Sequence, residues 1–586
     1  MGASATVGKQ DTETAPSMYG PTADGTVPAA DDDPGVIGLD PTRVLPRRIA
    51  WWARREPDRP FLVEVTGRTA TYGETLDGVR RWCAELAARG VRRGDRVVSL
   101  LPSCVDAHLV WLAASCLGAY EVPVNPELRG EFLRHVLTDA GAVLCVARPE
   151  TAHLPALAGV ELATLVVGPA GLPPGDLADL ADHADPAGTY PADAEASSLP
   201  TDAAARLPAP ADPSCVIYTS GSTGMPKGVI VTWGQMSAVI GRIPRSWLSE
   251  TDAVYSYLPM FHVTGRTPLV VMSDVGGRVV LRERFSVSAF WDDVRAFRAT
   301  STTAHVSLLL AAPERPDDRD NPMRVVFGGH SADQNRRFAE RFDLDVLDAY
   351  GSTEAGFPIL LRRPRDASRR WCGWVRRGYT ARIVDEQRVE VPDGTVGELE
   401  IRPPAPELIA AGYLGLPAKT AEVFVDGWYR TGDALVRHPD GCFEFVDRIR
   451  DTIRRLGENI SASAMEEVVV TDPDITDCAV IGVPDEILGQ AVLLAVEPRP
   501  GIVLDAEAVA RRLVDILPRH MHPAFVDVWD ALPRTPNNKV RKPDVLAGHE
   551  SGEGPSARWT AAARHAGPRP ADPAQHDRGA GPEAAA

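Results

Sequence analysis

Residues 218–228 read YTSGSTGMPKG and follow the apolar stretch CVI at 215–217. The run holds three glycines, which allow the backbone to approach a ligand closely. It also holds four Ser or Thr hydroxyls and Lys227, which together with free backbone N–H groups suit phosphate oxygens. A flexible Ser/Gly turn is the alternative, but eleven residues ending in Pro-Lys-Gly are unusual for one. The stretch therefore predicts a phosphate-binding loop after a buried strand.

This loop differs from the phosphate loop of the P-loop nucleoside triphosphatases. Their motif, GxxxxGK followed by Ser or Thr, needs a glycine before the lysine and a hydroxyl after it. Lys227 instead stands between Pro226 and Gly228. The sequence therefore disfavours a P-loop enzyme.

The segments around the loop alternate between helix and strand patterns. Helix patterns cover 44–55, 71–89 and 105–117, and strand patterns cover 61–65, 95–101, 142–147, 278–281, 324–327 and 397–401. This alternation predicts an α/β fold with layered, doubly wound and largely parallel sheets in a large N-terminal domain. Beyond residue 447 a shorter unit has strand patterns at 478–483 and 491–497 and a helix pattern at 506–516, which is typical of a small α+β domain.

Charge and composition divide the chain further. The net charge of −18 is concentrated in residues 1–40 (−6) and 171–213 (−7), which leaves the rest of the chain near neutral. We expect an acidic disordered leader (1–40), a large domain (41–446) with a low-complexity insert (171–213), a small mobile domain (447–548) and a disordered tail (549–586). The charge argues against a nucleic-acid or anionic-membrane binder.

The eight cysteines have no C-x-x-C spacing, and no apolar run reaches the roughly 18 residues of a membrane span. The N-terminus has no secretory signal pattern. We therefore expect a cytoplasmic protein with reduced thiols and no membrane span.

Further motifs follow the loop in a fixed order. They are LPMFHVTG at 258–265, YGSTE at 350–354, YRTGD at 429–433, DRIRD at 447–451 and PRTPNNK at 533–539, with ATYGETL at 70–76 as a looser match. Over about 500 residues, this series closely resembles the adenylate-forming superfamily, which includes acyl- and aryl-CoA synthetases, firefly-type luciferases and the adenylation domains of peptide synthetases.

The resemblance implies a reaction in two halves. A carboxylate attacks the α-phosphate of ATP to give an acyl-adenylate and pyrophosphate, and a thiol then displaces AMP. Both halves develop negative charge on oxygen, so the site needs positioned cations and hydrogen-bond donors more than a base. ATP, Mg²⁺ and CoA are the expected cofactor and co-substrates.

The resemblance also assigns residues to the nucleotide. Those that would cover the β- and γ-phosphates are Thr219, Ser220, Gly221, Ser222, Thr223, Gly224 and Lys227. Tyr350 would lie against the adenine, Thr353 would donate to the α-phosphate, and Glu354 would hold Mg²⁺. Taken alone, YGSTE is typical of a helix start.

Four more residues complete this set. Asp433 would accept hydrogen bonds from the ribose hydroxyls, and Arg448 would reach the same sugar or a phosphate. Gly329 would contact the adenine edge through its backbone, beside His330, where the family has a small residue. Lys539 would meet the α-phosphate as a point charge during adenylation.

The same resemblance places Arg450 at a hinge that turns the small domain between the two half-reactions. Gly457 would line the pantetheine tunnel. The sequences of residues 426–430, 457–460 and 480–489 resemble those of acyl-CoA ligases of the carnitine and fatty-acid type. This resemblance favours free CoA as the acceptor. The alternatives are a stand-alone enzyme of bacterial secondary metabolism, such as antibiotic biosynthesis, that loads a carrier protein, and one that activates an oxyacid such as nitrite.

The acid pocket is expected around 261–268, 304–310, 327–331 and 351–357. His262 would lie near the substrate carboxylate, or else serve as a structural histidine. Arg266 could meet an anionic group of the substrate, although we expect it to form a surface salt bridge. The expected substrate is a short or aromatic organic acid.

Replacing Lys539 by Ala should lower acyl-adenylate formation by several orders of magnitude, because the charge on the α-phosphate would lose its counter-ion. Thioester formation from preformed acyl-adenylate should persist. Pyrophosphate release and single-turnover thioester formation measure the two halves, and unchanged pyrophosphate release would refute the assignment.

Overall fold

The computed structural model describes residues 39–172, 207–219, 225–240, 248–328, 332–361, 371–448, 452–456, 458–534 and 540–561. The chain forms two compact units, Met1–Gly221 with Met225–Arg450 and Ser222–Gly224 with Asp451–Ala586. The second unit begins close to residue 447, where the sequence pattern changes. Most of the expected leader and insert lies outside the described residues.

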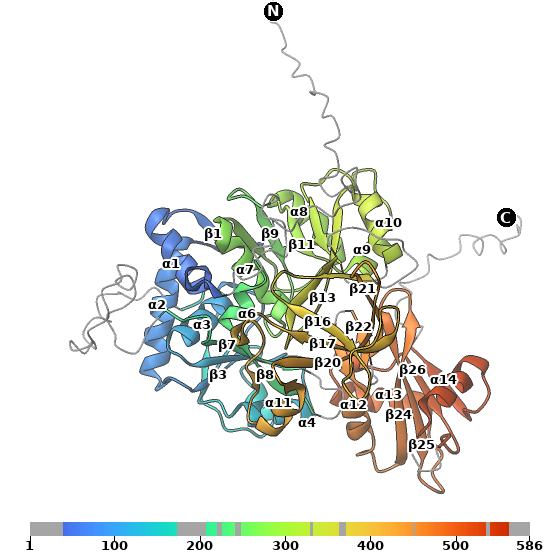
Figure 1. Cartoon of the computed structure of the whole chain (residues 1–586). Coiled ribbons are helices and arrows are strands. Elements are labelled where there is room, and N and C mark those ends of the chain that lie inside the picture. Colours follow the sequence, from blue (N-terminus) through green and yellow to red (C-terminus); the bar gives the residue numbers. More distant parts are fainter. Residues whose placement is uncertain are drawn as a thin grey trace, which may run out of the picture. The chain divides into compact units, whose positions relative to one another are not determined.

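One sheet of the large unit has seven strands in the order β18-β8-β7-β4-β3-β5-β6. Its strands β3, β7 and β8 are labelled in Figure 1. Its bounds are β3 (Arg96–Leu100), β4 (Tyr120–Pro123), β5 (Leu144–Ala147), β6 (Thr164–Val166), β7 (Pro213–Thr219), β8 (Lys227–Thr232) and β18 (Gly412–Tyr413). Strands β3 to β7 pair in parallel, whereas β8 is antiparallel to β7 and to β18. The predicted loop thus joins two neighbouring antiparallel strands, unlike a P-loop, which opens a helix.

The other sheet has fourteen strands, and one half of it is largely parallel. That half runs β13-β12-β11-β9-β10-β1-β2, with β1 (Pro60–Glu64), β2 (Thr69–Thr71), β9 (Ala253–Ser256), β10 (Arg278–Leu281), β11 (Ser301–Thr303), β12 (Val325–Phe327) and β13 (Asp345–Ser352). Only the last pair of this half, β1 with β2, is antiparallel.

The other half of this sheet differs from the expected strand–helix alternation. It contains β14 (Gly356–Leu361), β15 (Trp371–Val375), β16 (Thr380–Val384), β17 (Val396–Arg402), β19 (Phe424–Val425), β20 (Trp428–Arg437) and β21 (Phe443–Arg448). All of their pairings are antiparallel. Antiparallel neighbours can be joined by tight turns, whereas parallel strands need a crossover. The strand–helix alternation expected for the large domain was therefore wrong for this region.

Helices fill and cover the large unit. They are α1 (Leu45–Arg55), α2 (Tyr72–Ala88), α3 (Val105–Cys116), α4 (Gly130–Ala140), α5 (Leu154–Leu157), α6 (Trp233–Ser237), α7 (Val263–Val275), α8 (Val287–Ala296), α9 (Val306–Ala311), α10 (Ala332–Phe342) and α11 (Pro417–Val423), with short 3-10 turns η2 (Pro41–Arg43) and η6 (Pro406–Leu408). Every residue of α3 is buried, and the helix packs against β3, β4 and β7 of one sheet and β1 of the other. It therefore lies in the core between the two sheets.

The small unit is α+β, as predicted. Its sheet runs β23-β22-β25-β26-β27, with β24 on β25, and its bounds are β22 (Thr452–Arg455), β23 (Glu458–Ser461), β24 (Ile475–Asp485), β25 (Gly489–Pro498), β26 (Phe525–Val528) and β27 (Ala557–Thr560). Its helices are α12 (Ala462–Val469), α13 (Ala506–Ile516) and α14 (Lys542–Ser551), with the 3-10 turn η7 (Arg519–Met521).

The folded chain extends beyond the expected end at residue 548. Helix α14 continues to Ser551, and β27 pairs antiparallel with β26. The ring of Trp529 lies against Gly548 and Gly554, where an added Cβ would come within 2.4 Å of it. Composition alone predicted that Gly554 belongs to the tail, whereas Gly554, like Gly548, leaves the space that Trp529 occupies.

All eight cysteines are buried free thiols. Across the described ranges, no helix has both the length and the apolar character that a bilayer crossing demands.

Replacing Gly554 by Ala should destabilise the small unit, because the new methyl group would overlap the Trp529 ring. We expect a loss of about 1–3 kcal/mol in the free energy of unfolding, measured by calorimetry. Gly501→Ala is the matched control, since Gly501 also has a positive φ but has no atom within 4 Å of an added Cβ. Equal losses in the two variants would show that the Trp529 contact is unimportant.

Candidate active site

The YGSTE motif forms the end of one strand and a tight turn. Strand β13 ends at Ser352, residues 353–355 form the turn, and β14 begins at Gly356. The Ser352 hydroxyl accepts a hydrogen bond from the Ala355 amide at 3.0 Å. An added Cβ at Gly351 would lie 2.2 Å from the carbonyl oxygen of Gly356, so this position must be glycine. The motif is therefore a hairpin tip that carries Thr353 and Glu354, and not a helix start.

Two other segments fix the backbone of this turn. The buried side chain of Gln235, on α6, donates from Nε2 to the carbonyl oxygens of Thr353 (2.7 Å) and Glu354 (3.2 Å). The Ala410 amide also donates to the Glu354 carbonyl at 2.8 Å. The sequence analysis missed Gln235 because its partners are backbone atoms more than a hundred residues away, and these leave no local pattern.

The Glu354 side chain meets a tyrosine that the sequence analysis also missed. The Tyr413 hydroxyl donates to Oε1 of Glu354 at 2.9 Å. Burial and the Glu354 charge raise the pKa of Tyr413, so the hydroxyl keeps its proton and remains a donor. Nζ of Lys227 lies 5.9 Å from the centroid of the Tyr413 ring. Tyr413 therefore contacts both Glu354 and Lys227, which belongs to the phosphate loop.

Tyr413 lies in the stretch GYLG at 412–415, between two of the recognised motifs. Its Gly412 has a φ of +132°, and an added Cβ there would lie 2.6 Å from Cγ2 of Thr420. The only sequence signal for Tyr413 was its position directly after a glycine. This signal does not reveal the contact of Tyr413 with Glu354.

The predicted adenine and ribose residues touch each other. The Tyr350 hydroxyl donates to Oδ2 of Asp433 at 2.6 Å, and both residues are buried. Burial and the Asp433 carboxylate raise the pKa of Tyr350 well above its usual range, so Tyr350 stays a neutral donor. The two residues are 83 positions apart in the sequence.

This contact requires the sheet to curl. Strands β13 and β20 are separated by β14, β15 and β21. Four strand spacings of about 4.8 Å would place them roughly 19 Å apart in a flat sheet, which a tyrosine side chain cannot span. A single apolar cluster that includes Tyr350, Ile359, Leu399, Leu435 and Phe443 fills the inside of the curl.

The backbone around Asp433 is also held in place. Gly432 has a φ of +71°, and its amide donates to Oε1 of Glu398 at 3.1 Å. The Asp433 amide donates to the Thr431 hydroxyl at 3.1 Å. Asp433 is the register partner of Arg448 across β20 and β21, and the structure describes the backbone of Arg448 but not its side chain.

The phosphate loop is described only at its two ends. Thr219 and Lys227 are register partners across β7 and β8, so the loop leaves and re-enters the sheet at neighbouring positions. The remaining predicted site residues Ser220, Gly221, Ser222, Thr223, Gly224, Gly329, Gly457 and Lys539 lie outside the described part of the chain, as does the predicted hinge Arg450.

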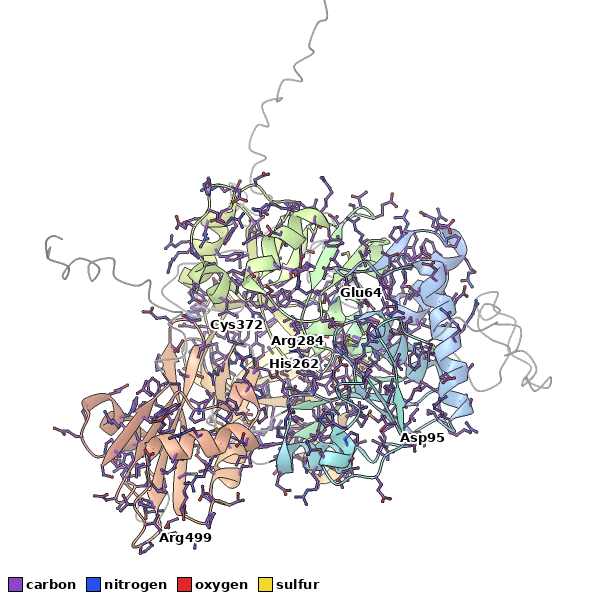
Figure 2. All side chains as sticks on the ribbon, turned by 180° about the vertical axis from the view of Figure 1, so that it is seen from behind. Glu64, Asp95, His262, Arg284, Cys372 and Arg499 are labelled. Carbon is purple, nitrogen blue, oxygen red and sulfur yellow. The ribbon has the colours of Figure 1, made fainter. Side chains whose placement is uncertain are left out.

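His262 lies immediately before α7 in the large unit and is half-buried (Figure 2). Its amide donates to the Pro259 carbonyl at 3.1 Å, and its ring centroid lies 4.9 Å from that of Phe261. The half-buried ring is consistent with a pocket position as well as with a structural role.

Arg266 is not on the surface, which corrects the sequence interpretation. It is fully buried, and its Nη2 lies 2.6 Å from Oε2 of the equally buried Glu121. The salt bridge was anticipated correctly but its location was wrong. Helix α7 is buried on several sides, so even its arginine points into the protein.

The residues present fit a magnesium ion that is held mainly by phosphates. Mg²⁺ is usually bound by one or two carboxylates together with substrate phosphates and water. Glu354 supplies one half-buried carboxylate at the hairpin tip. The described residues hold no cluster of three His, Cys, Asp or Glu that would form a metal site by itself.

Two family models match this chain, one in each unit. Residues 49–414 match the model of the AMP-binding enzymes, and residues 464–539 match the model of their C-terminal domain. Crotonobetaine/carnitine–CoA ligase from Citrobacter koseri is 30% identical over 498 residues, covering 82% of this chain and 93% of the relative. Sulfoacetate–CoA ligase from Cupriavidus necator is 30% identical over 520 residues, covering 85% and 96%.

Solved structures share the fold. The amide bond synthetase McbA from Marinactinospora thermotolerans has a TM-score of 0.72 and 26% identity, covering 86% of this chain and 99% of that one. A benzoate–CoA ligase from Burkholderia xenovorans has a TM-score of 0.60 at 22% identity, covering 86% and 99%. With the matched family models spanning both units, this chain belongs to the AMP-binding, adenylate-forming enzymes, in their acyl-CoA synthetase branch, and is an AMP-forming ligase.

Proposed function

We propose that this ligase activates a short or aromatic organic acid with ATP, forms the acyl-adenylate, and passes the acyl group to free CoA with release of AMP. The observation that carries the proposal is the contact between Tyr350 and Asp433, together with the grouping of Lys227, Tyr413 and Glu354. Both groupings bring predicted nucleotide residues from distant motifs together in one unit.

The triphosphate would be held by residues at the loop and at the hairpin tip. Lys227 offers a positive charge, and Thr219 with residues 220–224 offers hydroxyl and amide donors for the β- and γ-phosphates. Thr353 would donate to the α-phosphate from a turn that Gln235 holds in place. Glu354 would hold Mg²⁺, which when bound neutralises negative charge on the phosphate oxygens.

The nucleoside would be held by the buried pair. Tyr350 fixes the Asp433 carboxylate through one oxygen, which presets the orientation of the acceptor for the ribose hydroxyls. Tyr350 would present its ring to the adenine, with Gly329 at the adenine edge and Arg448 near the sugar or a phosphate.

The remaining assignments concern the acid and the small unit. His262, at the start of α7, would lie near the substrate carboxylate. Lys539 would stabilise charge on the α-phosphate during adenylation, and Gly457 would line the path of pantetheine during thioester formation.

Free CoA as the acceptor of the acyl group is supported by the names of the relatives, which are CoA ligases of small acids. A second candidate has a specific observation in its favour, because the neighbour with a TM-score of 0.72 is an amide bond synthetase. In that case an amine, rather than the CoA thiol, would displace AMP from the acyl-adenylate. A carrier-protein thiol and activation of nitrite, both compatible with a role in bacterial secondary metabolism, are further outcomes of the same test.

The test is AMP release from ATP and Mg²⁺ with a panel of short aliphatic acids, aromatic acids and nitrite. Each acid is assayed with CoA, with a primary amine, with a phosphopantetheinylated carrier protein and without acceptor, and products are identified by mass spectrometry. We expect AMP together with an acyl-CoA. An amide, an acyl-carrier product or AMP release with nitrite would select the corresponding alternative, and no AMP under any condition would contradict the proposal.

Replacing Tyr413 by Phe should weaken the magnesium-dependent step, because Glu354 would lose the donor that fixes its carboxylate. A hydrogen bond to a charged group contributes about 1.5–3 kcal/mol, so we expect a roughly ten- to hundredfold lower rate of pyrophosphate release and a higher Mg²⁺ requirement. The matched control is Tyr255→Phe, which removes a tyrosine bond to Asp293 of 2.7 Å elsewhere in the large unit. A similar Mg²⁺ titration for both variants would argue against the role of Tyr413.

A further inference from the structure

Three buried polar residues form a cluster in the core of the large unit, separate from the nucleotide residues. They are His108 on α3, Glu121 on β4 and Arg266 on α7, and each is 0% exposed. Nη2 of Arg266 lies 2.6 Å from Oε2 of Glu121, and its guanidinium carbon lies 4.7 Å from the centroid of the Trp111 ring. The ion pair therefore connects the start of α7 to a central strand of the seven-stranded sheet.

The cluster is not explained by stability alone. Arg266 Nη1 and both ring nitrogens of His108 have no protein hydrogen-bond partner in the described part of the chain. Burial and the Arg266 charge lower the pKa of His108 to about 3, so the imidazole is neutral near pH 7 and adds no counter-charge. Replacing a buried ion pair by well-packed apolar residues is often neutral or stabilising. An apolar pair could not supply a directed hydrogen bond to a neighbouring segment.

Arg266 makes such a hydrogen bond to the segment that precedes it in the sequence. Its Nε donates to the Met260 carbonyl at 2.8 Å. The same segment is closed by bonds from the His262 amide to the Pro259 carbonyl and from the Gly265 amide to the His262 carbonyl, each 3.1 Å long. An added Cβ at Gly265 would lie 2.2 Å from the Pro259 carbonyl oxygen, so the turn is tightly packed. Arg266 is thus anchored at one end by Glu121 and holds this turn at the other.

We propose that Arg266, anchored by Glu121, is a positioning residue that fixes segment 258–265, and His262 with it, for binding of the carboxylic acid substrate. The inference rests on the proposed function, in which His262 lies near the substrate carboxylate. A fixed His262 places the acid without loss of conformational entropy on binding. Removing the anchor therefore weakens acid binding while the candidate nucleotide residues on β13, on β20 and in the turn 353–355 keep their own contacts.

The main variant is the double substitution Glu121→Leu with Arg266→Met, which removes both charges and fills the space with apolar side chains. We expect the KM for the acid to rise about tenfold, with the KM for ATP within about twofold of that of the parent enzyme. The melting temperature should stay within about 4 °C of the parent value. Arg266→Lys, which keeps the charge but lacks the planar Nε donor, should give an intermediate KM for the acid.

Arg148→Met is the matched control. Arg148 is 3% exposed, its Nη1 donates to the Val167 and Gly168 carbonyls, and its Nη2 lies 3.8 Å from Asp106, so it too is a buried arginine that holds backbone. It should change neither KM. An unchanged KM for the acid in the double variant, or a parallel rise in the KM for ATP, would overturn the inference. If the double variant does not fold, Glu121→Gln decides, since it removes the charge and keeps the shape, and an unchanged KM for the acid would again overturn it.

A second readout does not depend on activity. Hydrogen exchange of the His262 and Gly265 amides, measured by mass spectrometry of a peptide covering 258–266, should be faster in the double variant and unchanged in Arg148→Met. Equal exchange in the parent and the double variant would overturn the positioning role. If the parent enzyme releases no AMP with any acid, the proposed function fails, and hydrogen exchange still decides whether Arg266 fixes the segment.

Discussion

The hydrogen bond from Tyr350 to Asp433 depends on the curl of the second half of the fourteen-stranded sheet, and the candidate site depends on both. In a flat sheet these two residues would be separated by four strand spacings, yet the hydroxyl and carboxylate lie 2.6 Å apart. The curl is maintained by an apolar cluster drawn from seven strands of the sheet, β13 included. Because apolar burial drives the curl, the polar pair can be buried with its hydrogen bond made and without the cost of an unpaired hydroxyl.

The other candidate residues are held in a similar way, by contacts that reach across the fold. The turn that carries Thr353 and Glu354 follows the end of β13, but Gln235 from α6 and the Ala410 amide fix its backbone. The side chain of Glu354 is fixed by Tyr413, on a strand that belongs to the other sheet. Residues at the ends of strands are thus held rigidly, which is what a site that stabilises developing charge requires.

Arg266, in the core, likewise holds a neighbouring segment in one conformation. A buried arginine and a buried glutamate contribute little net stability, whereas their directed bonds hold a turn in one conformation. The pair differs in this respect from the surface ion pairs of the chain, such as Arg336 with Glu340, in which both side chains are more than half exposed and solvent screens the attraction.

Much of the fold followed from local patterns. Helix and strand periodicity located α1, α2, α3 and α13 and the strands β3, β10 and β25 nearly at their observed bounds. Periodicity did not distinguish the antiparallel half of the second sheet, because a half-buried strand has the same pattern whichever way its neighbour runs. Composition suggested a tail from residue 549, whereas Gly554 there leaves room for Trp529, and β27 pairs with β26 in the sheet.

The sequence by itself determined the family and predicted the two-unit organisation and the candidate nucleotide residues, because glycines, hydroxyls, carboxylates and lysines in a fixed order restrict what a site can do. Only the tertiary structure decided which residues hold these candidates, and the segment 258–265, in place. Gln235, Tyr413 and Glu121 act on groups 59 to 145 positions away in the sequence, and they became visible once the sheets had brought those groups within hydrogen-bond distance. A hydrogen bond between distant segments leaves no periodicity in the chain, so it can be read only from the folded molecule.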